Sequence, residues 1–151
     1  MLLARAYLGM QCFWGESAFA KVKGIKKTRV GYAGGTTANP TYGNIGDHTE
    51  ITESKYGDIE TYVVKLDKFY QAEDYHQKYW LRNQRDIFDE LKLNDSQVAN
   101  SILATKINAY CAGYTDFSEL EELKKDHGLS DSLVDRIKRF ASAGGDPRAC
   151  H

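Results

Sequence analysis

The sequence predicts a mixed α/β domain in which a small mixed sheet precedes a helical C-terminal part. Up to Leu66, short β-branched and aromatic segments alternate with glycines, and from Ala72 onward apolar residues recur at helical spacing. With 42% hydrophobic residues among 151, the chain holds enough apolar surface for the core of one ordinary domain. We therefore expect a single domain over 1–151, sheet-rich over 1–66, helical over 72–143 and flexible over the tail 144–151.

The first half predicts four strands and one helix. The strands are expected over 4–10, 27–33, 50–56 and 60–66, and the short connection 57–59 suits a hairpin between the last two. Residues 15–23 are expected to form a helix that ends at Gly24 and packs Phe19 and Val22 inward. Cys12 then falls in a strand-to-helix turn, and 36–49 is a loop rich in turn residues.

The second half predicts four helices. They are expected over 72–91, over 96–110 with Asn94 or Asp95 as cap and Ile102 in the buried stripe, from a capping box at Ser118 to Gly128, and over 131–142. Glycines 144 and 145 and a proline at 147 end the last helix, so the tail is expected to be a short flexible arm.

Charge and composition exclude several classes of partner. Twenty Lys and Arg against 21 Asp and Glu give a net charge of -1, so no overall field attracts nucleic acid or an anionic membrane. The one basic cluster, over 21–29, lacks interleaved aromatics and is interpreted as a solvated face. No apolar run approaches the roughly 20 residues that span a bilayer, and no secretory signal is evident. We expect a cytoplasmic protein.

The three cysteines point to thiol chemistry rather than to disulfides or zinc. Cys12, Cys111 and Cys150 are odd in number and far apart, with no Cys-x-x-Cys motif. Cys12 precedes a helix, whose N-terminal dipole favours a thiolate, although a small buried hydrophobe beside Phe13 and Trp14 is the alternative. Cys111 ends a helical stripe and is expected to be buried, whereas Cys150 is either a resolving thiol or an idle one.

Five short motifs identify a resemblance. They are Gly9-Met10-Gln11-Cys12-Phe13-Trp14-Gly15-Glu16, Gly31-Tyr32-Ala33-Gly34-Gly35, Asn39-Pro40-Thr41-Tyr42, Asp47-His48-Thr49-Glu50 and Ala72-Glu73-Asp74-Tyr75-His76-Gln77. In this order they resemble signatures of the peptide methionine-S-sulfoxide reductases. The helical C-terminal half also resembles the helical tail of some animal members. The resemblance implies reduction of methionine-S-sulfoxide, free or in proteins, with thioredoxin as electron donor and no metal or organic cofactor.

The resemblance also implies a role for each site residue. Cys12 is the nucleophile at sulfur, Glu50 the acid that protonates the leaving oxygen, and Tyr42 a hydrogen-bond donor to that oxygen. Phe13 and Trp14 hold the methyl group. Cys12 becomes a sulfenic acid, which a second cysteine converts into a disulfide for thioredoxin to reduce. Cys150 is the better second cysteine, because a Gly-rich arm reaches Cys12 at small loop-closure cost.

Taken singly, these residues have simpler interpretations. Glu50 at the start of a strand is usually a solvated carboxylate, and Tyr42 an aromatic in a turn. His48 and His76 are more often structural than metal-binding, because no second ligand stands at a zinc spacing. Tyr75 and His76 line the substrate pocket or merely pack a helix.

Two departures from the family bear on activity. Gln11 stands where the family has Gly, and only residues 57–59 join two strands that the family separates by several tens of residues. The family's segment supplies an Asp and a Tyr that help bind the sulfoxide, and this sequence has no counterpart for them. An inactive relative that only binds oxidised-methionine segments is therefore the alternative. A thiol peroxidase would need a polar hole at Cys12, whereas Phe13 and Trp14 predict an apolar one.

Overall fold

A computed structural model describes residues 5–9, 12–54 and 66–149. Its sheet has four strands in the order β1-β3-β2-β4, all antiparallel. The strands are β1 (Ala6–Gly9), β2 (Thr28–Ala33), β3 (Thr49–Ser54) and β4 (Phe69–Gln71). The predicted mixed α/β class is confirmed, although the sheet is antiparallel rather than mixed in strand direction.

Helix α1 (Cys12–Ala20) lies between β1 and β2, and the other helices follow the sheet in the chain. They are η1 (Asp74–His76), α2 (Tyr79–Asn83), α3 (Arg85–Phe88), η2 (Asp89–Leu91), α4 (Asp95–Asn100), α5 (Ile102–Cys111), α6 (Leu120–His127) and α7 (Asp131–Ser142). Within the described ranges, none of them is long and apolar enough to cross a bilayer.

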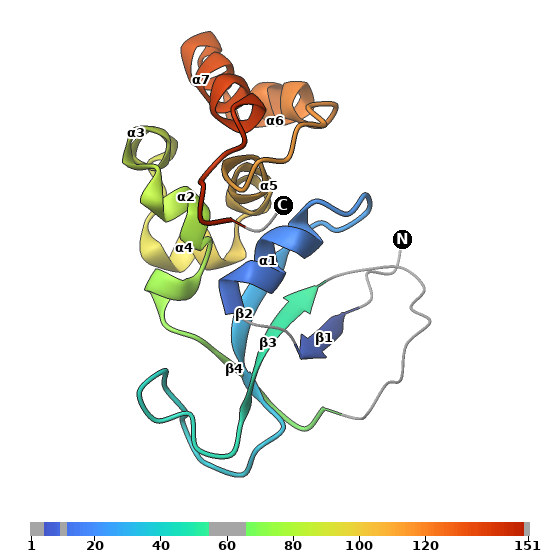
Figure 1. Cartoon of the computed structure of the whole chain (residues 1–151), viewed down its shortest axis with the longest axis vertical. Helices are drawn as coiled ribbons and strands as arrows, with labels where there is room; N and C mark the ends of the chain where they lie inside the picture. Colours follow the sequence, from blue (N-terminus) through green and yellow to red (C-terminus); the bar gives the residue numbers. More distant parts are fainter. Residues whose placement is uncertain (1–4, 10–11, 55–65, 150–151) are drawn as a thin grey trace.

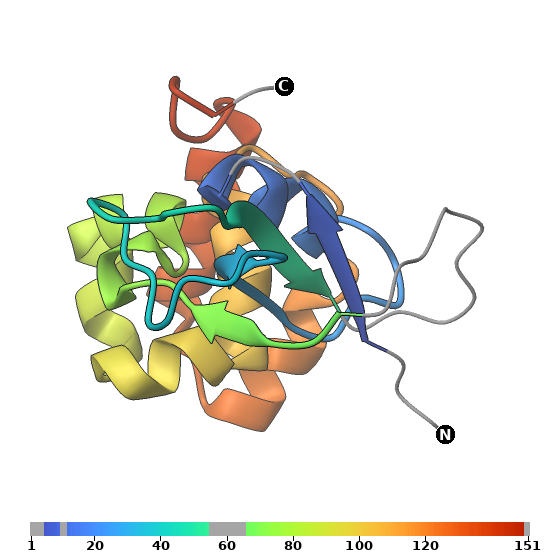
Figure 2. The ribbon, with the colours of Figure 1, turned by 90° about the horizontal axis from the view of Figure 1, so that it is seen from below.

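The elements form a sheet layer and a helical layer with α1 at the junction. Helix α1 contacts β2 and β3 on one side and α2 and α5 on the other. Helices α6 and α7 lie farthest from the sheet (Figure 1), and the view from below places the sheet in front of the helical layer (Figure 2). A large helical core surrounds α5, and a smaller one lies on the sheet at Val30, Tyr32 and Ala72. Phe13 packs against both cores, so the start of α1 lies where the layers meet.

Several predicted elements need correction. Helix α1 covers 12–20 rather than 15–23, so Cys12 is its first residue, and Val22 beyond its end is 39% exposed. The predicted strand 60–66 and its hairpin lie almost wholly outside the described residues, while Leu66 is not in a strand and β4 follows at 69–71 instead. The short connection 57–59, which departs from the family, also lies outside the described residues.

The predicted helices 72–91 and 96–110 are both interrupted. The first consists of η1, α2, α3 and η2, with Lys78 in a left-handed conformation (φ 55°) between η1 and α2. The second is divided at Ser101, whose extended backbone ends α4 and whose hydroxyl caps α5 by accepting from Ala104 N at 3.0 Å. Ile102 therefore begins α5 and is 47% exposed instead of buried.

The end of α7 is held by hydrogen bonds rather than forming a flexible arm. Gly144 N donates to Ala141 O and Gly145 N to Phe140 O, both at 3.0 Å, with φ of 100° and 67° at the two glycines. This pairing is a Schellman motif, which needs left-handed backbone just past the helix. Asp146 N then donates to Cys111 O at 2.8 Å, and Ala149 is 5% exposed within the helical core. Residues 144–149, here called the strap, thus pack on the core.

Candidate active site

The first turn of α1 brings the Cys12 motif to the junction of the two layers. Cys12 is the first helical residue, so it lies among backbone N–H groups that have no partner within the helix, although its side chain lies outside what the structure describes. Phe13 stacks on Tyr79 with ring centroids 4.1 Å apart and lies 6.5 Å from the His76 ring. Trp14 instead stands edge-on to Trp80, at 5.0 Å. Phe13 therefore lies near the His76 ring, whereas Trp14 packs on Trp80.

Tyr42 lies in the loop between β2 and β3, and Asp47 stabilises this loop by hydrogen bonds to Thr36 and Thr37. The Asp47 carboxylate accepts from the backbone N–H and the hydroxyl of both Thr36 and Thr37, at 2.7 to 3.0 Å. These bonds hold the pKa of Asp47 well below its usual range. His48 is 7% exposed, accepts from Gly35 N through Nδ1 at 3.1 Å and contacts Thr37 O through Nε2 at 2.7 Å. The structural interpretation of His48 is confirmed.

Glu73 joins this loop to the sheet. One carboxylate oxygen accepts from the Tyr42 backbone N–H at 2.8 Å, and the other from the Tyr32 hydroxyl at 2.7 Å. Burial opposes ionisation of this carboxyl, but the bonds from Tyr42 and Tyr32 outweigh it, so the pKa of Glu73 is lowered. Three of the five motifs therefore meet at one carboxylate.

His76 lies at the centre of the aromatic cluster. It is 4% exposed, with the Tyr75 ring 4.3 Å away and the Tyr42 ring 4.8 Å away, and both tyrosines are more than half exposed. Burial lowers the pKa of His76, and the carboxylates of Glu73 and Glu50 oppose that shift in part. At neutral pH the imidazole is therefore mainly neutral. Whether His76 is structural or lines the substrate pocket stays a prediction.

Glu50 approaches the cluster from β3. It pairs with Tyr32 across the sheet, and directly paired residues put their side chains on the same face. Its side chain is half-buried, and its charge acts on His76. The charge of Glu50, the Tyr42 ring and the Phe13 ring thus all lie near His76.

The structure brings together some of the predicted site residues. Those in one cluster are Phe13, Tyr42, Glu50, Tyr75 and His76. Cys150 and the side chain of Cys12 lie outside the described residues, and Trp14 packs on Trp80. The sequence arguments missed Tyr32, Glu73 and Tyr79 as members. The sequence offered a signal for Tyr32 and Glu73, because each lies within one of the five motifs. Tyr79 lies outside the motifs.

A buried ion pair behind the cluster was also missed. Glu16 Oε1 lies 2.5 Å from Lys78 Nζ, and Glu16 Oε2 accepts from Lys78 N at 2.8 Å. Thr28 donates its hydroxyl to Glu16 at 3.1 Å and accepts from Lys78 Nζ through its carbonyl at 2.6 Å. The pair connects Glu16 in the second turn of α1 to Lys78, which follows His76 by two residues.

Cys111 is buried and weakly reactive. It is 1% exposed, and burial raises the pKa of its thiol far above the ordinary range. The expected burial of Cys111 is confirmed. Any reaction of this thiol would require the end of α5 to open.

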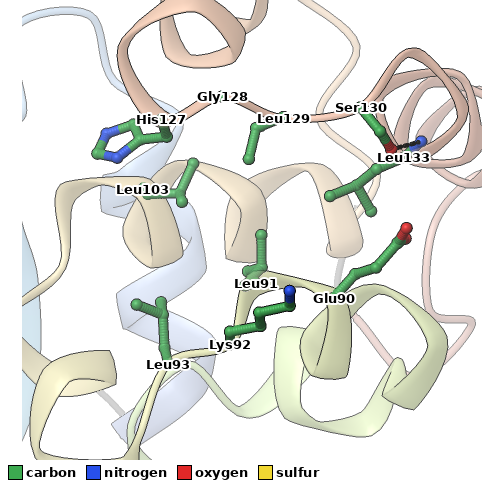
Figure 3. Close-up of a pocket in the computed structure, with 10 residues that line it drawn as sticks. All are labelled: Glu90, Leu91, Lys92, Leu93, Leu103, His127, Gly128, Leu129, Ser130 and Leu133. Carbon is green, nitrogen blue, oxygen red and sulfur yellow. Dashed lines mark hydrogen bonds between the residues drawn. The ribbon is translucent and has the colours of Figure 1, made fainter.

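A separate cavity lies away from this cluster. It has a volume of about 430 Å³. Five of its ten lining residues are leucines, and His127 and Lys92 are among the others (Figure 3). None of the predicted site residues lines it. Within the described ranges, no group of three or more His, Cys, Asp or Glu side chains is arranged to hold a metal ion.

Comparison with known sequences gives one family. A sequence profile described as peptide methionine sulfoxide reductase matches residues 4–56 and 48–109. The two matches overlap over residues 48–56 and together span residues 4–109.

Individual relatives carry the same description. A peptide methionine sulfoxide reductase of Drosophila melanogaster is 28% identical over 186 aligned positions, covering 84% of this chain and 76% of the relative. The alignment is longer than the chain, so the relative has residues without a counterpart here. Peptide methionine sulfoxide reductase A5 of Arabidopsis thaliana is 40% identical over 50% of this chain and 30% of its own length. Peptide methionine sulfoxide reductase MsrA of Methanoculleus marisnigri is 44% identical over 48% of this chain and 48% of its own length. The chain spans about half or less of the plant and archaeal relatives.

Proposed function

Because the chain belongs to the peptide methionine sulfoxide reductase family, we propose that it reduces methionine-S-sulfoxide, free or within proteins, to methionine. The observation that carries this proposal is that Glu50, Tyr42 and Phe13, the residue after Cys12, all lie near His76. Reduction of a sulfoxide needs a nucleophile at sulfur and a proton for the oxygen. The cluster offers the carboxyl of Glu50 near an apolar ring, and we assign the nucleophile to Cys12, the first residue of α1.

The first half of the reaction uses the Cys12 thiol. Its sulfur attacks the sulfoxide sulfur, the oxygen takes a proton from Glu50, and the S–O bond breaks as oxygen passes to Cys12. A thiol and a sulfoxide become a sulfenic acid and a thioether, so atoms and electrons balance. Tyr42 donates a hydrogen bond to the oxygen, while Phe13 and Trp14 contact the methyl group. The exposed Tyr75 and the buried His76 complete the substrate pocket.

The second half restores the thiol. Cys150 attacks the Cys12 sulfenic acid, water leaves, and thioredoxin reduces the resulting disulfide by exchange. The reaction draws its two electrons from that dithiol and uses no metal or organic cofactor. Burial of Cys111 supports Cys150 for this role. A cytoplasmic location, where thioredoxin keeps thiols reduced, is part of the same proposal.

Turnover with the proposed donor tests this function. A peptide containing methionine-S-sulfoxide is incubated with the protein, thioredoxin, thioredoxin reductase and NADPH. We expect one NADPH oxidised for each methionine formed, and no oxidation with Cys12→Ser. A protein that binds the oxidised peptide but forms no methionine would overturn the proposal and favour the binding-only relative.

A further inference from the structure

Within the strap, the buried carboxylate of Asp146 binds the guanidinium of Arg148. Asp146 is 3% exposed and accepts from Arg148 through backbone N at 3.0 Å, Nε at 2.9 Å and Nη2 at 2.8 Å. Gln84 Nε2 adds a fourth bond at 3.3 Å. The side-chain bond from Arg148 holds the pKa of Asp146 below its usual range, despite burial. Such a two-nitrogen contact fixes the orientation of the guanidinium as well as its position.

The arginine so oriented lies against the wall of the candidate active site. Its guanidinium carbon is 5.8 Å from the ring centroids of both Tyr79 and Trp80. Tyr79 in turn stacks on Phe13, the residue after Cys12. An unbroken series of contacts therefore runs from Asp146 through Arg148 and Tyr79 to the first turn of α1.

The backbone of the strap is held at the same place. Asp146 N donates to Cys111 O, and Ala149 N donates to Asp146 O at 2.9 Å, which closes a turn over Pro147 and Arg148. Gly145 allows this approach, because a Cβ there would lie 2.3 Å from Gly113 N. In Figure 1 the strap descends from α7 beside α2. The chain is thus fixed up to Ala149, one peptide unit before Cys150.

We propose that Asp146 and Arg148 are positioning residues for the resolving step: they latch the strap onto Tyr79 and Trp80 and so speed the attack of the Cys150 thiol on Cys12. The inference rests on the proposed function. In that step the Cys150 sulfur bonds to the Cys12 sulfur, the S–OH bond breaks, and the hydroxide leaves as water with the thiol proton. The latch does not take part in the earlier attack on the sulfoxide.

Arg148→Ala tests the latch, because the side chain is 54% exposed and its loss leaves no unfilled core. With one equivalent of methionine-S-sulfoxide, we expect methionine to form at the wild-type rate but the Cys12–Cys150 disulfide to form on the order of tenfold more slowly. Turnover with thioredoxin should fall by the same factor. Turnover with excess dithiothreitol, which reduces the sulfenic acid directly, should not change. Asp146→Asn should also slow disulfide formation and turnover with thioredoxin, but by a smaller factor than Arg148→Ala.

Arg139→Ala is the matched control, since Arg139 is an exposed arginine in the last turn of α7. In a second experiment, diamide oxidises the reduced protein. Diamide forms disulfides between nearby thiols without any sulfoxide. Slower Cys12–Cys150 pairing in Arg148→Ala than in Arg139→Ala supports the latch even if the protein reduces no sulfoxide. Disulfide formation at the wild-type rate in Arg148→Ala, in either experiment, would overturn the latch while leaving the proposed function intact.

Discussion

The carboxylate of Glu16 and the ammonium of Lys78 lie 2.5 Å apart with neither side chain exposed to solvent. Burial lowers the pKa of Lys78, and the charge and hydrogen bonds of Glu16 oppose that shift. Because Glu16 also accepts from the backbone N–H of Lys78, the pair connects α1 to the chain segment that carries His76. It sets the relative position of two parts of the candidate site.

Removing one partner should destabilise the fold strongly. Lys78→Met leaves the Glu16 carboxylate buried without its counter-ion, so we expect a loss of about 3–5 kcal/mol in the free energy of unfolding. Urea unfolding of wild type and variant measures this difference in the free energy of unfolding. Arg85→Ala, which breaks the exposed pair with Asp89, should cost less than about 1 kcal/mol. A loss for Lys78→Met as small as that of the control would show that the buried charges contribute no more than surface ones.

The charge of Glu50 should be visible in the titration of His76. Burial places the pKa of His76 below its ordinary value of 6.5, and the Glu50 carboxylate raises it in part. Glu50→Gln should therefore lower the pKa of His76 further. NMR titration of the imidazole protons checks this. An unchanged pKa would mean that the two side chains do not interact.

Glu50 should also control the chemical step. If its carboxyl protonates the departing oxygen, Glu50→Gln slows single-turnover formation of methionine on the order of 10²–10⁴-fold. Glu122→Gln, at an exposed position on α6, is the control and should leave the rate unaltered. A normal rate in Glu50→Gln would assign the proton to another donor.

Acid should weaken the latch. Because Arg148 holds the pKa of Asp146 below its ordinary 3.8, the ionised carboxyl stabilises the fold fully above that value. This contribution is lost as the pH falls from about 4 through the lower pKa of the folded state. Unfolding free energies of wild type and Asp146→Asn, measured between pH 7 and pH 2, should therefore converge on acidification. A constant difference would exclude this linkage.

Helix α7 depends on local capping and could be predicted from the sequence. Helix α7 covers the expected 131–142 because Ser130 accepts from Leu133 N at 3.1 Å and Gly144 ends it. At Ser118 the prediction of a capping box was wrong. There the backbone N–H of Ser118 donates to Asp116 Oδ1 at 3.0 Å, and α6 begins only at Leu120.

Elements shaped by distant contacts could not be predicted. The apolar periodicity over 72–91 gives no sign that Lys78 interrupts the helix, since its partner Glu16 lies 62 residues away. The same holds for the strap, which is anchored to Cys111 and Gln84. In the site, the motifs indicated Tyr42 and His76. The bond of Glu73 to both Tyr32 and Tyr42 required the fold.

The measurement that tests the central claim most directly is methionine formed per protein chain in one turnover without added reductant. Methionine-S-sulfoxide and methionine-R-sulfoxide are each supplied in excess to wild type and to Cys12→Ser. We predict about one methionine per chain from the S form with wild type, and none from the R form or with Cys12→Ser. Equal yields from both forms, or a full yield with Cys12→Ser, would contradict the account.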